Sequence, residues 1–463
     1  MSGAVASSVD GRRFTFESPN DQLDLRPGGY AVCGENLGQV HEVEPRERGF
    51  ARGGGVLLDP EVKPFGEVPI EAAAEERVSA WLETVRPEGA ALDVGELVLQ
   101  PGLRFALDAS GFDRHTFFCG QSGSGKTYAL GTVLERLLLE TSLRIVVLDP
   151  NSDFVRLDAV RDGIDDELAS RYRAATDSLV VRRGNAEEAD RLHVRFVDCD
   201  PEEQAAVLRL DPIADADEYG TLLDLLDSGL ERSSESTEAL AGKLLESKLP
   251  GQHQLGARLR NLGVAGWPVW STGDAGSVQD LVAPGGPRAV VVDLGSLATP
   301  GEKAIAGEAV LAALWRRRAE REATLIVIDE AHNVCPRDPA DPVAELATEH
   351  AARIAAEGRK FGLYLLVSTQ RPQRVNELVV SQCDNLVLMR MASRSDLDWV
   401  AETLSFAPRP LLEQATAFGQ GESLVAGKIA SHHPVLVRFG PRLAEEGGSD
   451  VPTAWASRPV SPP

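Results

Sequence analysis

Hydrophobic and polar positions alternate over short stretches in the first part of the chain. Between about residues 10 and 60, the segments RRFTFES, GYAVCG, LGQVHEVE and GGGVLLD are separated by turns rich in glycine and proline. Such alternation is typical of half-buried strands and favours a small β-barrel or sandwich over helices. We therefore predict a β-barrel-like domain over residues 1–65. A connector over residues 66–103 follows, with one amphipathic helix around IEAAAEERVSAWLETV.

From about residue 104, continuous apolar runs alternate with helical segments. The first run, HTFFCG, is followed by a helix in KTYALGTVLERLLLET and by a second strand in LRIVVLDP. Runs of this kind suit strands buried on both faces, and their alternation with helices is the pattern of a mostly parallel sheet covered by helices. Later strands are expected in RAVVVDL (288–294), TLIVIDE (324–330), LYLLVSTQ (363–370) and NLVLMRM (385–391).

The strands stop between Asp200 and about Gly276, where segments such as PEEQAAVLRL and LGARLRNLG have helical periodicity. We predict an α/β fold whose core, residues 104–199 and 281–442, is divided by a helical insertion over residues 200–280. Residues 443–463 are polar and rich in proline, so we expect a loosely ordered, flexible tail there.

Composition narrows the possible environments and partners. The chain carries 47 basic and 71 acidic side chains, a formal charge of −24. This disfavours a monomer whose outer surface binds nucleic acid, but it leaves open a ring whose narrow channel concentrates a few basic side chains. The five cysteines form no C-x-x-C pair, and no apolar run approaches the roughly 20 residues of a membrane span. We expect a cytoplasmic protein with no membrane segment, disulfide framework or zinc site.

The segment GQSGSGKT fits the phosphate-binding loop G-x-x-x-x-G-K-[ST] and lies between a predicted strand and a predicted helix. Its glycines let backbone amides and the helix N-terminus face the phosphates of ATP. Lys126 is expected to reach the β- and γ-phosphates, and the Thr127 hydroxyl to bind Mg²⁺. The predicted nucleotide-binding residues are Gly120, Gln121, Ser122, Gly123, Ser124, Gly125, Lys126 and Thr127.

Two later strand ends supply further candidate chemistry. TLIVIDE ends in Asp329, expected to order the Mg²⁺ shell, and Glu330, expected to polarise the attacking water. His332 is given no catalytic role. LYLLVSTQ ends in Gln370, which we expect to contact the γ-phosphate or the attacking water.

Two arginines are candidates for an arginine finger that one subunit supplies to its neighbour's nucleotide. Arg359 and Lys360 follow a predicted helix in HAARIAAEGRKFG, where basic residues also offset the helix dipole. Arg390, which ends the strand in NLVLMRM, is the competing candidate. The sequence leaves the choice between Arg359 and Arg390 open.

These segments, in this order, resemble the HerA–FtsK superfamily of ring-forming ATPases, and the HerA branch in particular. Beyond the phosphate loop, the branch has a strand ending D-P-x-[GS]-[DE]-[FY], matched by DPNSDF at 149–154. DEAH (329–332), GRKFG (358–362), TQRP (369–372) and SQCDNLVLMR (381–390) match its later motifs. The resemblance covers roughly residues 112–154 and 290–438.

The resemblance implies a RecA-like P-loop NTPase core with a small N-terminal β-barrel and a helical insertion. It implies a homo-hexameric ring that binds ATP between subunits and moves double-stranded DNA through its channel. It also implies a nuclease partner such as NurA in DNA end processing, or an effector enzyme in phage defence. We therefore predict an ATP-hydrolysing, DNA-translocating ring motor.

Two alternatives stay open on sequence alone. A nucleotide-gated scaffold would organise an effector protein without translocation, and a conjugation- or secretion-type ATPase would move protein. The basic clusters Arg182–Arg183 and Arg316–Arg318 could line a channel or lie on solvated faces. No zinc-finger or helix-turn-helix pattern is visible, so we do not expect sequence-specific DNA recognition.

Overall fold

The N-terminal strands form a closed barrel in the order β1-β2-β5-β4-β3-β6. The computed structural model describes residues 4–20, 24–46, 49–228, 236–271, 276–431 and 433–447. Phe14 and Phe16, on alternate positions of β2, point into the barrel core. Gly55 allows close strand contact, because a Cβ there would lie 1.9 Å from the carbonyl oxygen of Gln39. The strands are β1 (Val5–Ser8), β2 (Arg13–Pro19), β3 (Tyr30–Cys33), β4 (Asn36–Pro45), β5 (Phe50–Leu57) and β6 (Phe65–Ala72).

The boundary expected at residue 65 differs from the structure. Strand β6 lies almost wholly beyond it and pairs with both β1 and β3, so the barrel cannot close without it. The expected connector is therefore divided between two units. After β6 come helix α1 (Glu75–Thr84) and strands β7 (Ala91–Leu97) and β8 (Arg104–Asp108), and these two strands join the large sheet.

The large sheet has 11 strands in the order β11-β12-β10-β13-β14-β9-β15-β16-β17-β7-β8. From β11 to β15 in this order, neighbouring strands run parallel; from β15 to β8 they run antiparallel. The sheet is thus mixed, with the predicted parallel part at its core. Its remaining strands are β9 (His115–Cys119), β10 (Arg144–Asp149), β11 (Leu179–Arg183), β12 (Ala289–Asp293), β13 (Thr324–Ile328), β14 (Leu363–Thr369), β15 (Cys383–Met389), β16 (Glu422–Gly427) and β17 (Val435–Phe439).

Helices cover both faces of this sheet. Alternate residues of one strand enter different cores: Phe118 of β9 packs with α2 (Lys126–Glu140), whereas Phe117 packs in the core that contains α9 (Pro300–Arg316) and α10 (Pro342–Glu357). The continuous apolar runs of the sequence are therefore explained by burial on both faces. The other helices of the core are α3 (Asp166–Thr176), α11 (Glu377–Val380), α12 (Arg394–Thr403) and α13 (Arg409–Glu413).

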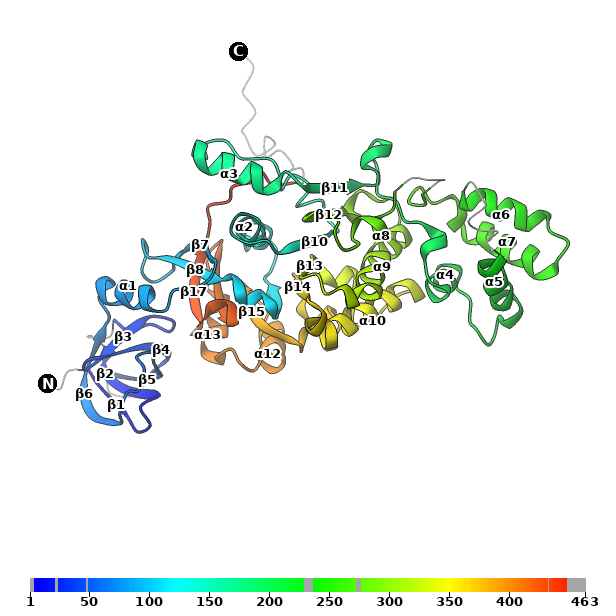
Figure 1. Cartoon of the computed structure of the whole chain (residues 1–463). Coiled ribbons are helices and arrows are strands. Elements are labelled where there is room, and N and C mark those ends of the chain that lie inside the picture. Colours follow the sequence, from blue (N-terminus) through cyan, green and yellow to red (C-terminus); the bar gives the residue numbers. More distant parts are fainter. Residues whose placement is uncertain are drawn as a thin grey trace, which may run out of the picture.

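The helical insertion is present and lies far from the barrel. Figure 1 shows α5, α6 and α7 at one end of the molecule, the barrel at the other, and the sheet between them. Arg316 of α9 links the insertion to the core through ion pairs with Asp200 and Glu203 at the start of α4. The insertion helices are α4 (Pro201–Leu208), α5 (Ala216–Ser228), α6 (Thr237–Glu246), α7 (Pro250–Leu262) and α8 (Val278–Leu281).

The expectation of a loose tail from residue 443 is wrong for its first residues. Leu443 and Ala444 are buried, and their backbone N–H groups donate to the carboxylate of Glu135 on α2. The buried Arg442 guanidinium donates to the same carboxylate over 2.8 Å. This network ties residues 442–444 to the core, and the N–H groups of Glu445 and Gly447 donate to the carbonyl oxygens of Ala159 and Asp153. The rest of the expected tail lies outside the described residues. Over the described part of the chain, no helix is both long and apolar enough to cross a bilayer.

Candidate active site

The phosphate loop connects β9 to α2 at the edge of the sheet where the parallel strands end. Gly123 and Gly125 have φ of 73° and 93°, a region that favours glycine, and Gly125 directly precedes the first residue of α2. The first amides of this 15-residue helix therefore border the loop. A cleft of about 540 Å³ opens over it, lined by Gln121, Ser122, Gly123, Gly125, Lys126, Thr127, Tyr128, Gln370, Gln420, Gly421, Arg438, Phe439 and Glu446.

Neighbouring strands fix the shape of the loop. The backbone N–H of Gly120 donates to Thr369 O of β14, and that of Gln121 donates to Arg390 O after β15. On the other side, Gly421 N–H donates to the carbonyl oxygen of Ser124. The loop is thus tied to the strand ends on both sides, which positions it before any ligand arrives.

Lys126 is buried against the carboxylates that end β13. Its side chain is only 3% exposed, and Nζ lies 2.6 Å from Asp329 Oδ1 and 3.2 Å from Glu330 Oε1. Ser368 bridges the same pair, because Lys126 Nζ donates to its hydroxyl over 3.0 Å and the hydroxyl donates to Asp329 Oδ1 over 2.7 Å. Burial alone lowers the pKa of Lys126, but the carboxylates of Asp329 and Glu330 outweigh it and raise the pKa above its usual value.

Glu330 is held by the strand end next to it. Gln370 Nε2 donates to Glu330 Oε1 over 2.6 Å, and the Gln370 backbone N–H donates to Oε2 over 3.3 Å. His332 Nδ1 lies 3.3 Å from Oε2 and 3.1 Å from the Thr369 hydroxyl. The φ of Glu330 is 41°, a conformation that costs a non-glycine residue about 1–3 kcal/mol and persists where neighbours impose it. The carboxylate is therefore fixed in direction beside Lys126.

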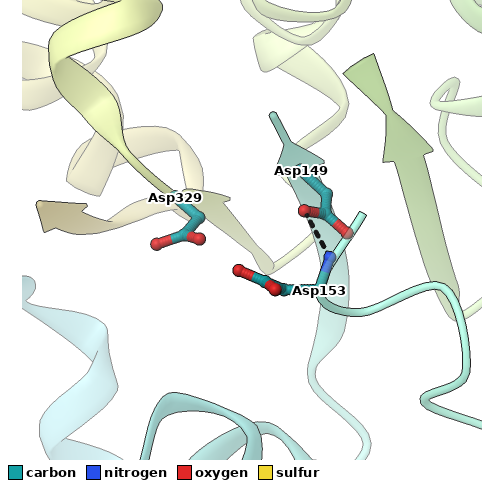
Figure 2. A group of neighbouring side chains, drawn as sticks. All are labelled: Asp149, Asp153 and Asp329. Atoms are coloured by element: carbon teal, nitrogen blue, oxygen red, sulfur yellow. Dashed lines mark hydrogen bonds between the residues drawn. The ribbon is translucent and has the colours of Figure 1, made fainter. Parts of the chain in front are cut away.

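A second group of carboxylates faces this centre from β10 and the turn after it. Figure 2 shows Asp149, Asp153 and Asp329 converging, and one ligand oxygen from each lies within 4.8 Å of the others. The turn wraps the Asp149 carboxylate, which accepts from the N–H groups of Asp153 and Phe154 over 3.0 and 2.8 Å. Asp153 also accepts a 3.4 Å hydrogen bond from the Thr127 hydroxyl.

This carboxylate group fits a hard divalent cation such as Mg²⁺. Oδ2 of the fully buried Asp329 is the one carboxylate oxygen of the three aspartates recorded as buried without a hydrogen-bond partner. An unpartnered buried carboxylate oxygen is costly unless a cation or water completes it, and Mg²⁺ prefers oxygen ligands. Sequence reasoning named Thr127 and Asp329 and gave no role to Asp149 or Asp153. Their signal was the segment DPNSDF directly after a buried strand.

We expect Mg²⁺ binding at this group to increase with pH. Burial raises the pKa of Asp149 to about 7 and that of Asp153 to about 6, so both carboxyls are mostly protonated at pH 5.5 and mostly ionised at pH 8. Because ionised carboxylates bind divalent cations, Mg²⁺ should raise the melting temperature of nucleotide-free protein at pH 8 much more than at pH 5.5. Differential scanning fluorimetry with a Mg²⁺ titration measures this difference.

In metal-free protein, the pH dependence of stability has the opposite sign. Because the pKa values of Asp149 and Asp153 are higher in the folded protein, the two carboxyls contribute fully to stability below pH 3.8, the pKa of an unfolded aspartate. This contribution is lost as the pH rises through about 7. The matched variant is Asp153→Asn, which keeps the side-chain volume and removes the charge. A Mg²⁺ shift at pH 8 that is as large in this variant as in the parent would place the cation elsewhere.

The sheet separates the two candidate arginines. Arg390 lies against the phosphate loop of its own chain, where Nη2 donates to Gly123 O over 3.0 Å. Arg359 precedes β14, whereas Gln370 follows it, so the strand's seven residues, about 20 Å, lie between them. The Arg359 side chain is 38% exposed and pairs with Asp384 at the start of β15. The structure thus brings Arg390, and not Arg359, to the phosphate loop of the same chain.

Comparison with known proteins agrees with this architecture. The family described as Helicase HerA, central domain, matches residues 92–252. The chain is 25% identical to the DNA double-strand break repair helicase HerA of Pyrococcus furiosus over 88% of this chain and 79% of that protein. It is 31% identical to the HerA of Sulfurisphaera tokodaii over 38% of this chain and 36% of that protein.

Two solved structures share the fold at low identity. VirB4 of Thermoanaerobacter pseudethanolicus superposes with a TM-score of 0.51 and 14% identity, covering 76% of this chain and 97% of VirB4. The bacterial conjugative coupling protein TrwB gives a TM-score of 0.52 and 12% identity, covering 81% of this chain and 93% of TrwB. The predicted RecA-like α/β fold is confirmed, and the chain is a P-loop ATPase that is similar to HerA helicases over most of its length.

Proposed function

We propose that this ATPase is a motor that couples ATP hydrolysis to movement along double-stranded DNA. The observation that carries the catalytic part is Glu330, held by Gln370 over 2.6 Å and placed beside the buried Lys126. A carboxylate fixed at this point is suited to accept a proton from water that attacks the γ-phosphate. Gln370 then acts by orienting Glu330, and Arg390 steadies the phosphate loop from within the same chain.

The nucleotide would be held by the loop amides and Lys126. Lys126 stabilises negative charge on the β- and γ-phosphates, and the cleft beside Tyr128, Arg438 and Phe439 offers room for the nucleoside. The side chains of Thr127, Asp329 and Asp153 are suited to holding Mg²⁺. Asp149 lies beside the other two aspartates. When bound, Mg²⁺ neutralises charge that develops on the transferred phosphate.

The DNA substrate and the assembly are part of the proposal. The relatives are named as DNA double-strand break repair helicases, which supports DNA as the track. We propose a homo-hexameric ring with ATP between subunits, acting with a nuclease or another effector protein. The exposed position of Arg359, away from its own phosphate loop, supports a role toward a neighbouring copy.

ATP hydrolysis with and without linear duplex DNA tests the proposal. We expect DNA to stimulate turnover at low salt and to stimulate it less at moderate salt, because non-specific DNA binding depends on phosphate contacts. Hydrolysis that is robust and indifferent to DNA at both salt concentrations would contradict the motor and favour the scaffold or protein-transfer function.

Catalysis across subunits makes a separate prediction for Arg359. Arg359→Ala should lower turnover by about a hundredfold or more without weakening ATP binding, since an arginine finger contributes about 10³ or more to turnover. Mixing Arg359→Ala with Lys126→Ala subunits should restore activity, because one subunit keeps an intact nucleotide site and the other keeps the arginine.

The matched control is Arg114→Ala. Arg114 lies 3.7 Å from Asp384, the carboxylate that also pairs with Arg359, so this variant disturbs the same ion-pair group. It should hydrolyse ATP at nearly the parent rate. No recovery in the mixed sample, measured under conditions where subunits exchange, would contradict the trans role of Arg359.

A further inference from the structure

The loops that follow β13 and β14 form one backbone unit beside the catalytic centre. Residues 331–341 follow Glu330, and residues 370–376 begin with Gln370. Pro336 and Val375 form an antiparallel bridge, Arg337 N–H donates to Arg374 O over 2.8 Å, and Asn376 N–H donates to Cys335 O over 3.0 Å. We call these two segments together the paired loops.

Buried side chains hold the paired loops in place. Cys335 and Val375 are fully buried in the core that contains α9 and α10, and Pro372 is buried at the start of the 3-10 turn Pro372–Arg374. In the same turn, Gln373 Nε2 donates to Asp396 Oδ1 of α12 over 2.9 Å. The turn is therefore anchored between its two arginines, Arg371 and Arg374, which are both exposed.

The paired loops carry three exposed arginines, Arg337, Arg371 and Arg374. Within the described part of the chain, their guanidinium groups have no ion pair and no side-chain hydrogen bond. This contrasts with other arginines of this acidic protein: Arg182 pairs with Asp190, and Arg316 pairs with Asp200 and Glu203. One arginine of each basic cluster visible in the sequence is thus neutralised by an acidic partner, whereas none of the three arginines of the paired loops is.

Four acidic residues belong to or border the paired loops, and two of them are engaged. Glu330 pairs with Lys126 and accepts from Gln370. The Asp341 carboxylate caps α10 by accepting from the N–H groups of Val343 and Ala344. Asp338 and Glu377 are exposed. Three guanidinium groups therefore face two free carboxylates on this unit, in a chain whose formal charge is −24.

We propose that Arg337, Arg371 and Arg374 bind the backbone phosphates of duplex DNA. This proposal rests on the function proposed above and assigns the residues that grip the track. Guanidinium groups match phosphate geometry through paired N–H donors, and phosphate contacts bind DNA without reading its sequence. A rigid unit with several unpartnered guanidinium groups suits a motor that passes over any sequence.

The same unit lies next to the residues proposed for hydrolysis. Gln370 contacts the Glu330 carboxylate through its side chain and its backbone N–H, and the next N–H, that of Arg371, donates to Thr369 Oγ1 over 3.0 Å. His332 contacts Glu330 and Thr369 from the other loop. A shift of Glu330 during the ATP cycle therefore has a short covalent and hydrogen-bonded path to Arg371.

The test is DNA binding by the full-length variant Arg371→Ala/Arg374→Ala. Fluorescence anisotropy with a labelled linear duplex is measured over a KCl series, in the presence of Mg²⁺ and a non-hydrolysable ATP analogue. Loss of two phosphate contacts should reduce the slope of log affinity against log salt by about 1.8 and weaken binding about tenfold or more at low salt. Arg371→Lys/Arg374→Lys, which keeps both charges, should retain most of the slope.

The matched control is Arg173→Ala/Arg317→Ala, which removes two other exposed arginines that carry no ion pair within the described residues. It should bind DNA with the parent slope. A parent slope and affinity in Arg371→Ala/Arg374→Ala would overturn the proposal. So would normal DNA binding combined with loss of DNA-free hydrolysis, which would assign these arginines to nucleotide.

Failure of the proposed function looks different from failure of this inference. If the parent protein neither binds duplex DNA nor hydrolyses ATP faster in its presence, the motor function itself is wrong. If the parent does both, and Arg371→Ala/Arg374→Ala does both equally while it melts at the same temperature as the parent, only the assignment of the gripping arginines is wrong.

Discussion

Replacing Glu330 by glutamine will leave ATP bound and reduce its hydrolysis by about a hundredfold or more, because a positioned general base contributes about 10²–10⁴ to the rate. Glutamine keeps the volume of Glu330 and can still accept the hydrogen bond that Gln370 Nε2 now donates over 2.6 Å. It cannot take the proton of the attacking water at neutral pH. Phosphate release and equilibrium binding of a fluorescent ATP analogue, measured on the same sample, separate the two effects.

His332→Gln is the matched control for this prediction. His332 lies 3.3 Å from the same Glu330 carboxylate, yet burial lowers its pKa and the residue has no proposed part in proton transfer. The control should retain hydrolysis within a fewfold of the parent. Hydrolysis at the parent rate in Glu330→Gln would remove Glu330 from the mechanism.

Lys126→Ala will reduce the affinity for ATP by about a hundredfold or more. The ammonium group is buried and pairs with both Asp329 and Glu330, which lie beside Asp149 and Asp153. Its removal deletes a buried charge-assisted contact to phosphate, worth about 1.5–3 kcal/mol. It also exposes the incoming phosphates to four carboxylates whose charge it offsets. Isothermal titration with Mg²⁺ and ATP measures the loss.

Lys428→Ala is the comparison for Lys126→Ala. Lys428 pairs with Asp113 on the surface, so its removal subtracts the same charge from the chain without touching the phosphate loop. It should bind ATP as the parent does. ATP affinity equal to the parent in Lys126→Ala, in a sample with unchanged circular dichroism, would contradict the assignment of the loop.

The parallel part of the sheet could be predicted because each strand is a continuous apolar run within one segment of sequence. The antiparallel part could not be. Strand β7 pairs with β17 across more than 300 residues of intervening chain, and neither strand carries a local signal for this pairing. The barrel boundary failed for the same reason, because β6 is defined by its pairing with β1 and β3.

The candidate site, too, could be predicted from the sequence only in part. Lys126, Asp329 and Gln370 could be expected to meet, since the ends of neighbouring parallel strands lie at one edge of a sheet. The sequence could not decide between Arg359 and Arg390 as the arginine finger, because the choice depends on which edge of the sheet each residue occupies. No sequence pattern pairs Arg337 with Arg374, because only the backbone pairing of two distant loops brings them together.

The central claim is that ATP hydrolysis moves this protein along duplex DNA, and displacement of a third strand tests it most directly. A labelled triplex-forming oligonucleotide is placed on a linear duplex, and its release is followed after protein, Mg²⁺ and ATP are added. The account predicts release that requires hydrolysable ATP, disappears in Glu330→Gln and is weakened in Arg371→Ala/Arg374→Ala. ATP hydrolysis stimulated by the duplex without any release of the third strand would contradict it.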